Sequence, residues 1–449
     1  MKAQIVLEAL PTHTRYVPLA VLGYCLTRTG FLKPVWEEIE WSMKTVWHAP
    51  TEKLQDMLVS ILAGNEAVSQ INTRLRPDLT LAVAWNREQF AEQSSIANTL
   101  NALEAQQTVQ LRVGSQRLFR QYSQTMRHDF EKQWLMIDID PTGLLASRSA
   151  EGSRKGYISG RRNQYCRQLA RLSVPTYHEN LYSMLYPGDQ QAAPTLKPAV
   201  TTTQEFLSLT RKQRQRTIIR SDASLGTDGN INWLLWLNYQ VLMKGFSGNR
   251  AISFAKRLSE EDWQEDPPRK RWIAWAPDPP RFARRANVFV LRWQGKDEMR
   301  YGTLISTFLE LEPLSTWRLH DGRGAMEVEI KADKQGLCVP KRRKKSFRAQ
   351  EGLVLLTDLA HNILSWTHHW VLEDSPFADF GTKRMVDELM CIPGRVEFMG
   401  NKLYKVALLE THPYADDMRL VLEKLLDLIA NPCFLLKIRG VALVEPPEF

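Results

Sequence analysis

Two short runs of β-prone residues, each leading to an aspartate, constrain the fold of this 449-residue chain more than any other feature. Residues 134–139 lead to Asp140 and the turn-forming residues 141–143, and residues 217–220 are followed closely by Asp222. Short apolar runs bounded by turn residues are typical of buried strands. We therefore expect a sheet with two carboxylates at its strand ends, set among helical segments in an α/β domain.

A third carboxylate stands in a segment that we expect to be helical, residues 320–334 (HDGRGAMEVEIKADK). At about 100° per residue, one side of this helix carries Arg323, Glu327, Lys331 and Lys334. A ladder of salt bridges along an exposed helix is one interpretation of this pattern. In combination with two strand-end aspartates, the glutamate favours metal-dependent phosphodiester chemistry, because Mg²⁺ takes hard oxygen ligands that converge from separate elements. The cations would then hold a nucleic-acid backbone.

The first 125 residues have apolar side chains at helical spacing, which predicts a helical bundle. Within it, residues 90–104 predict a helix that Ser94 or Ser95 would cap at its N-terminus. The second helix of a helix-turn-helix motif often begins in this way. A plain bundle helix fits the same residues equally well.

The middle of the chain changes in character after the second acid. Asp228 and Gly229 are expected to cap a helix that continues to about Lys244. Between residues 251 and 317, tryptophan and valine alternate with polar residues and proline pairs punctuate the pattern, which indicates an inserted β-rich unit.

The remainder of the chain predicts helices and one hairpin. Residues 350–372 are largely apolar and predict a buried helix. Gly400 and Asn401 are expected at a hairpin turn, before an amphipathic helix that ends at about Leu428. The expected organisation is a helical region (1–125), an α/β domain in two parts (126–250 and 318–372) around the insert (251–317), and a C-terminal region (373–449).

The charge of the chain points to a polyanionic partner. Lys and Arg outnumber Asp and Glu by 59 to 50, for a formal net charge of +9. The basic run 341–345, which includes Lys341, Arg342 and Arg343, is either a solvated loop or a segment that holds a DNA strand. The apolar run 16–26 is shorter than the ~20 residues that span a bilayer. We expect no membrane segment, no cleaved signal, and a protein that stays in the cell that makes it.

The five cysteines do not indicate a disulfide framework or a zinc site. They are odd in number and scattered, with no C-x-x-C pair among them. The nine histidines likewise form no H-E-x-x-H pattern. We expect reduced thiols.

These motifs together resemble those of bacterial insertion-sequence transposases of the DDE class. The order D…D…Y-x-x-R-x-x-x-E-x-x-x-x-x-x-K is typical of that family, and Arg323, Glu327 and Lys334 stand at its spacing. The segment WLMIDIDPTG is similar to the family's first-acid strand, and IIRSDASLG to its second-acid segment. The likeness extends from about Leu54 to Ile438.

The resemblance implies a fold, an activity and its partners. The expected fold is an RNase H-like α/β catalytic domain, and the expected reaction is cleavage at transposon ends followed by strand transfer into target DNA. Asp140, Asp222 and Glu327 would hold two Mg²⁺ or Mn²⁺ ions. The partners would be the terminal inverted repeats and the target, bound by a homodimer whose helical N-terminal region recognises DNA. A bacterial cytoplasm, in association with the nucleoid, is the expected location.

One departure from the family pattern and one ambiguity concern the site. His320 stands at the family's tyrosine position, where it can still donate a hydrogen bond to phosphate. Asp138 and Asp140 lie two apart on one strand and so point to the same face, which leaves two candidates for the first acid. Asp140 is favoured because Thr142 completes the D-x-T pattern of related transposases. Asp138 would then be an accessory ligand or would orient one.

Two other functions fit the same residues. A catalytically inactive or repurposed transposase-derived protein would keep the fold and the basic surface and only bind DNA. A nuclease would cleave DNA ends and never join them to a target. The presence of all three acids argues against the first of these alternatives.

Overall fold

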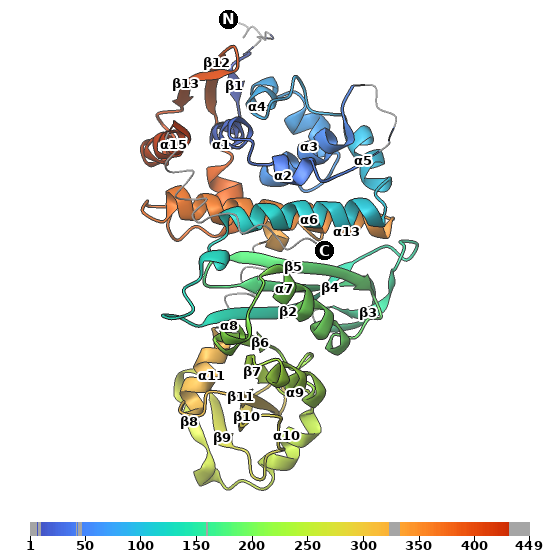
Figure 1. The fold of residues 1–449 in the computed structure, drawn as a ribbon, viewed down its shortest axis with the longest axis vertical. Helices are drawn as coiled ribbons and strands as arrows, with labels where there is room; N and C mark the ends of the chain where they lie inside the picture. The colour runs from blue at the N-terminus through green and yellow to red at the C-terminus, as the bar shows by residue number, and fades with distance from the viewer. Residues whose placement is uncertain are drawn as a thin grey trace, which may run out of the picture. The chain divides into compact units, whose positions relative to one another are not determined.

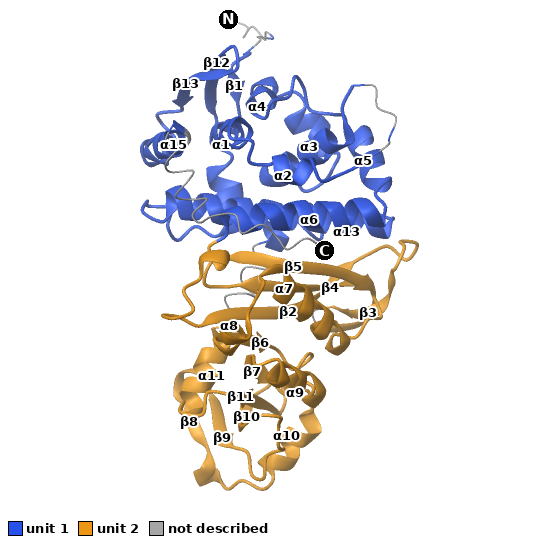
Figure 2. Ribbon diagram, in the orientation of Figure 1, with its two compact units in different colours: residues 1–123, 331–449 blue, residues 124–330 orange. Residues whose placement is uncertain are grey.

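The two acid-bearing runs form neighbouring strands of one large sheet in the computed structural model, which describes residues 7, 10–41, 43, 47–158, 160–322 and 333–430. The chain divides into two compact units, residues 1–123 with 331–449 and residues 124–330, coloured separately in Figure 2. This division differs from the expected one, because the helical N-terminal region shares a unit with the C-terminal part of the chain.

The second unit is built on a sheet to which the described residues contribute ten strands. Along the sheet the order is β3-β4-β2-β6-β7-β11-β10-β9-β8, and β5 also pairs with β4. The pairs β2–β6 and β6–β7 are parallel, and the other pairs are antiparallel. The strands are β2 (Leu135–Leu145), β3 (Arg154–Ile158), β4 (Arg161–Val174), β5 (Glu179–Pro187), β6 (Thr217–Ser221), β7 (Gln240–Lys244), β8 (Gln264–Asp266), β9 (Arg271–Trp275), β10 (Asn287–Gln294) and β11 (Met299–Ser306).

Helices connect these strands and cover the sheet (Figure 1). They are α7 (Leu196–Phe206), α8 (Arg211–Gln215), α9 (Asp228–Trp236), α10 (Gly248–Ala255) and α11 (Pro313–Asp321). Parallel strands need a crossover, which α9 supplies between β6 and β7. Near α11, the core contains buried side chains from β6, β7, β9, β10 and β11 together with Trp317.

The first unit is mainly helical, and α13 (Phe347–Thr367) is its longest described helix. This helix is buried on nearly all of its faces and packs against α3, α5 and α6. The other elements are α1 (Val17–Arg28), α2 (Lys33–Trp36), α3 (Pro50–Leu62), α4 (Leu79–Ala84), α5 (Gln93–Asn101), α6 (Ala105–Tyr122), α14 (Thr382–Arg384), α15 (Ala415–Ala430) and the small sheet of β1 (His13–Thr14), β12 (Gly394–Met399) and β13 (Lys402–Leu408). A helix that is apolar all round must be surrounded, which explains why the N-terminal helices and α13 form one unit.

Several expected elements are confirmed. The helix expected at 350–372 is α13, extended by a π-helical turn over His368–Leu372. The hairpin is β12–β13, with Gly400 at a φ of +59° in its turn, and α15 follows it. The four described cysteines are free thiols. Among the described residues, no helix is long and apolar enough to cross a membrane.

Three local expectations are wrong. The helix within residues 90–104 begins after Glu92, so Ser94 and Ser95 lie inside its first turn and do not cap it. The helix expected to reach Lys244 ends at Trp236, because the residues after it form β7 within the sheet. Strand β2 does not end at Asp140 but continues to Leu145, paired with β4.

The β-rich segment is confirmed as β-rich, and its strands join the large sheet. Strands β8 to β11 lie in it, and β11 pairs with β7 from Leu304 to Ser306. The expected insert therefore continues the sheet that carries the two acids and does not form a second sheet among the described residues.

Candidate active site

Asp140 and Asp222 lie at the same level on neighbouring parallel strands. The register of β2 and β6 pairs Asp138 with Arg220 and Ile139 with Ser221, and one further step places Asp140 beside Asp222. Strand β6 ends at Ser221, so β2 has no β6 partner beyond this level, and Pro141 can be accommodated there. Continuing this register puts the two acids at the same level of the sheet where β6 stops, although β2 itself continues.

Asp138 is fully buried and forms a two-pronged ion pair with Arg220. The distances are 2.6 Å from Nε to Oδ1 and 2.7 Å from Nη2 to Oδ2. Both side chains are almost completely inaccessible to solvent. Such fork geometry is the strongest arrangement that an arginine and a carboxylate can adopt. Both carboxylate oxygens of Asp138 are therefore engaged by Arg220, and Asp140 as the first acid stays a prediction.

Asp222 is held by the turn that follows β6. Its Oδ1 accepts hydrogen bonds from the Ser224 backbone N–H (3.0 Å) and the Ser224 hydroxyl (2.6 Å). An aspartate that accepts from the backbone two residues on forms an Asx turn, which restricts its rotamers. Both bonds go to Oδ1, so the turn fixes the direction in which the carboxylate presents Oδ2.

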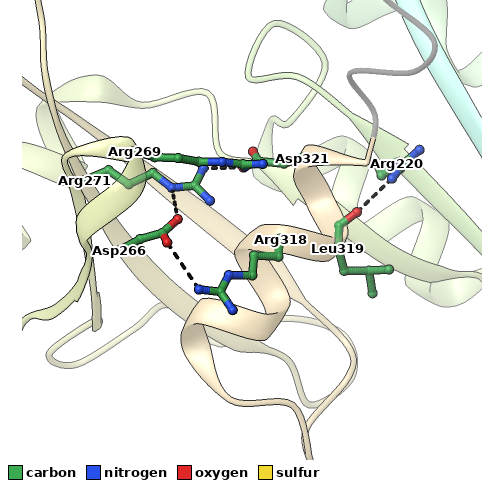
Figure 3. Close-up of polar contacts among 7 residues, drawn as sticks. All are labelled: Arg220, Asp266, Arg269, Arg271, Arg318, Leu319 and Asp321. Atoms are coloured by element: carbon green, nitrogen blue, oxygen red, sulfur yellow. Dashed lines mark hydrogen bonds and ion pairs between the residues drawn. The ribbon is translucent and has the colours of Figure 1, made fainter.

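The end of α11 is bound to the end of β6 by two hydrogen bonds. Nη1 of Arg220 donates to the Leu319 carbonyl (2.8 Å), as Figure 3 shows. Nε2 of the buried His320 lies 3.1 Å from the Ser221 carbonyl and carries the proton, because a carbonyl can only accept. The chain therefore leaves α11 at Gly322 beside the strand end that carries Asp222.

The placement of His320 gives it a structural contact that the sequence did not indicate. Its Nε2 is engaged by the backbone, so a phosphate contact by this side chain would have to come from Nδ1. The phosphate role stays a prediction. The observed bond makes His320 a positioning residue for the Ser221–Asp222 backbone.

Substitutions at His320 test this positioning role. We expect His320→Ala to lower DNA-end cleavage by roughly 10 to 100-fold, as for residues that orient a ligand, while His320→Gln retains more activity because its amide can donate to the Ser221 carbonyl. DNA-end affinity, measured by gel shift, should stay close to wild type in both. If the two variants lowered the cleavage rate equally, the hydrogen bond to the Ser221 carbonyl would not explain the role of His320.

The third carboxylate lies outside the described residues. Residues 323–332, which include Arg323, Glu327 and Lys331, are not among them, and Lys334 is described as half-buried in the first unit. No group of three metal-ligating side chains is present in the described ranges, where two of the three expected acids lie. Asp140 and Asp222 offer the hard carboxylate oxygens that a divalent ion such as Mg²⁺ prefers.

The basic run differs from its expectation at one position. Lys341 pairs with Glu66 (2.5 Å) and Arg343 is exposed, so both remain candidates for DNA contact. Arg342 is buried, and its guanidinium donates to the carbonyls of Asn65 (2.9 Å) and Leu337 (2.6 Å). Burial lowers the pKa of Arg342 to about 10. In this structure Arg342 therefore holds the first unit together and does not present a cation to DNA.

Two features of the site were missed from the sequence. Arg220 stands two residues before Asp222, and aligning the two acid-bearing strands in parallel would have placed it opposite Asp138. The ion pairs of Arg271 on β9 with Asp266 on β8 and Asp321 on α11 could not be found in this way, because Asp321 is far from Arg271 in the sequence.

Comparison with protein families identifies the chain as a transposase. It belongs to the family described as transposase DDE domain group 1, whose model matches residues 28–430. A search among curated proteins found no match.

Two solved transposase structures are similar to the chain at low identity. One is the piggyBac transposase synaptic complex with hairpin DNA, at 11% identity over 97% of this chain and 88% of that chain, with a TM-score of 0.48. The other is a pre-cleavage Mos1 transpososome, at 15% identity over 51% of this chain and 71% of that chain, with a TM-score of 0.18. The family membership rests on the family model and not on these likenesses.

Proposed function

We propose that this transposase cleaves DNA at the ends of a mobile element and joins the freed 3′-hydroxyl to target DNA. Asp140 and Asp222 are the first two catalytic acids, and Glu327 is the third. The observation that carries the proposal is the register that sets Asp140 beside Asp222 where β6 ends. Carboxylates from separate elements that converge at one edge are what a two-metal phosphodiester site requires.

The attachment of α11 supports the inclusion of Glu327. Gly322 is fixed near Arg220, and Glu327 follows it by five residues. Five residues span about 7.5 Å in a helix and at most roughly 18 Å when extended. The glutamate is therefore within reach of the edge that carries Asp222.

The sheet supports an RNase H-like catalytic core as part of this proposal. Strand β4 pairs antiparallel with both β5 and β2 in the order β5-β4-β2, and β6 and β7 follow in parallel to β2 with helices between them. This is a mixed α/β arrangement in which the two acids lie on its central, parallel pair. Ligand sites in parallel sheets form at the carboxyl ends of strands.

In the proposed reaction, two divalent ions, Mg²⁺ or Mn²⁺, would activate the attacking oxygen and stabilise the leaving one. Asp140, Asp222 and Glu327 hold them, and the Ser224 bonds keep the Asp222 carboxylate in one orientation. Asp138 and Arg220 neutralise each other in a buried ion pair next to these ligands, so neither leaves an unpaired charge there. Arg323, Lys331 and Lys334 hold the phosphates on either side.

The partners in this proposal are the terminal inverted repeats of the element and a target DNA, brought together by a homodimer. The formal net charge of +9 supports a polyanionic partner. Lys341 and Arg343 are further candidates for phosphate contact.

A plasmid assay tests the proposed function. Supercoiled DNA that carries the inverted repeats flanking the gene is incubated with the protein, with and without Mg²⁺ or Mn²⁺, and both cleavage and joining to a second plasmid are scored. We expect metal-dependent cleavage at the repeats and joined products. Binding without cleavage would indicate the inactive DNA-binding protein, and cleavage without joining would indicate a nuclease.

A further inference from the structure

A basic, aromatic pocket of about 540 Å³ lies in the second unit, where β7 ends. Its lining includes Lys244, Arg269, Lys270, Arg271, Trp293 and Trp317. Asp321 is the one acid among the residues that line it. The pocket belongs to the segment expected as the β insert and to its neighbours, and none of the expected site residues lines it.

Arg271 is the buried centre of this pocket. The residue is 7% exposed, and its Nε donates to Oδ2 of Asp266 (2.7 Å) while its Nη1 pairs with Asp321. Its guanidinium carbon lies 4.1 Å from the centre of the Trp317 ring. The remaining nitrogen, Nη2, has no hydrogen-bond partner within the described residues. A buried donor of this kind requires an explanation, because an unsatisfied polar group is costly.

The acids around Arg271 do not balance the cations. Asp266 also accepts from Arg318 (3.2 Å), and Asp321 pairs with Arg269 (2.5 Å), as Figure 3 shows. Two acids, Asp266 and Asp321, therefore face four cations, Arg269, Lys270, Arg271 and Arg318. Part of the positive charge offsets Asp321, whose carboxylate lies at the C-terminal end of α11, where the helix dipole is also negative. The remainder favours an anion in the pocket.

The pocket lies on the same edge of the sheet as the two acids. Ser221 pairs with Met243, so continuing the register by one residue puts Lys244 level with Asp222. The same step between β2 and β6 puts Asp222 level with Asp140. Neighbouring strands are about 4.8 Å apart, so Lys244 lies about 10 Å from Asp140 across the sheet. On the other side, Asp321 directly follows His320, which binds the end of β6.

We propose that this pocket binds one backbone phosphate of the DNA strand that is cleaved at Asp140 and Asp222, a few nucleotides from the cleaved phosphodiester. The inference rests on the proposed function. The Lys270 ammonium and the exposed Arg269 guanidinium supply the donors, and the buried Arg271 adds its positive charge behind them. Trp293, which pairs across the strands with Arg271, offers an apolar surface to the adjoining sugar. At roughly 3.4 Å of helix axis per nucleotide, 10 Å corresponds to about three nucleotides.

The test uses an exposed lysine of the pocket and a matched exposed lysine elsewhere. Lys270 has a φ of +47°, so Lys270→Asn removes the charge with a residue that tolerates this conformation. Lys256→Gln, directly after α10 and outside the pocket lining, is the control. Affinity for a duplex that carries the element end is measured on the full-length proteins between about 50 and 200 mM salt. We expect the slope of log K against log[salt] to become shallower by about 0.9 in Lys270→Asn, and to change less in the control.

A second arm asks whether the anion is the DNA backbone. Single methylphosphonate linkages, which are neutral, are placed along the strand near the cleavage position. At one of these positions the methylphosphonate should weaken DNA binding by the wild type and have little effect on DNA binding by Lys270→Asn. An unchanged salt slope in Lys270→Asn would overturn the proposal. It would also be overturned if the slope became shallower but no methylphosphonate position weakened binding to the wild type, because the pocket would then take a free anion. Failure of the proposed function is seen separately, as loss of metal-dependent cleavage by the wild type.

Discussion

Replacing Asp222 by asparagine is expected to lower the rate of DNA-end cleavage by about a thousandfold while leaving DNA-end binding close to wild type. A neutral amide cannot hold a divalent ion as a carboxylate does, and loss of ~4 kcal/mol of transition-state stabilisation corresponds to a thousandfold in rate. Asp140→Asn and Glu327→Gln should have the same effect. Single-turnover cleavage in Mg²⁺ and in Mn²⁺ measures the rate, and gel shift measures binding.

Asp297→Asn is the matched control for this series, because Asp297 is an exposed acid of the same unit in the turn between β10 and β11. It should cleave at the wild-type rate. Retained cleavage in Glu327→Gln would contradict the mechanism, since the third ligand would then be elsewhere. If Asp140→Asn cleaved and a folded Asp138→Asn did not, the first acid would be Asp138.

The position of the second acid could be predicted from the sequence because the relevant information is local. The run that ends β6 is short, apolar and followed by turn residues, and the strand does stop at Ser221. The end of β2 could not be predicted in this way. Its proline and glycine are typical of a turn, yet β4 pairs with β2 through Leu145 and holds these residues in the sheet.

Interactions between distant segments explain the other differences. Residues 240–244 read as the end of a helix, but parallel pairing with β6 makes them a strand. Arg342 lies in a run that reads as exposed, yet the Asn65 and Leu337 carbonyls bind its guanidinium inside the first unit. The partners are strand β6 in the first case and two backbone carbonyls in the second. Neither periodicity nor charge pattern in the sequence can indicate such a partner.

Removing one partner of the buried Asp138–Arg220 ion pair is expected to destabilise the second unit strongly. Breaking a buried ion pair by removing one partner costs about 3 to 5 kcal/mol, because the other charge is left uncompensated. Asp138→Asn should therefore lower the free energy of unfolding by this order. Arg220→Gln should also be destabilising, and it further removes the donor to the Leu319 carbonyl that holds the end of α11.

A double-mutant cycle measures the coupling between these two side chains. In the Asp138→Asn/Arg220→Gln variant no charge is left buried, so the loss should be smaller than the sum of the two single losses by about 1 to 3 kcal/mol. Urea denaturation followed by circular dichroism gives the free energies, with Asp297→Asn as a surface control. Additivity within about 0.5 kcal/mol would show that the pair is not coupled. A stable Asp138→Asn variant with full cleavage activity would show that Asp138 is neither a metal ligand nor the group that orients the site.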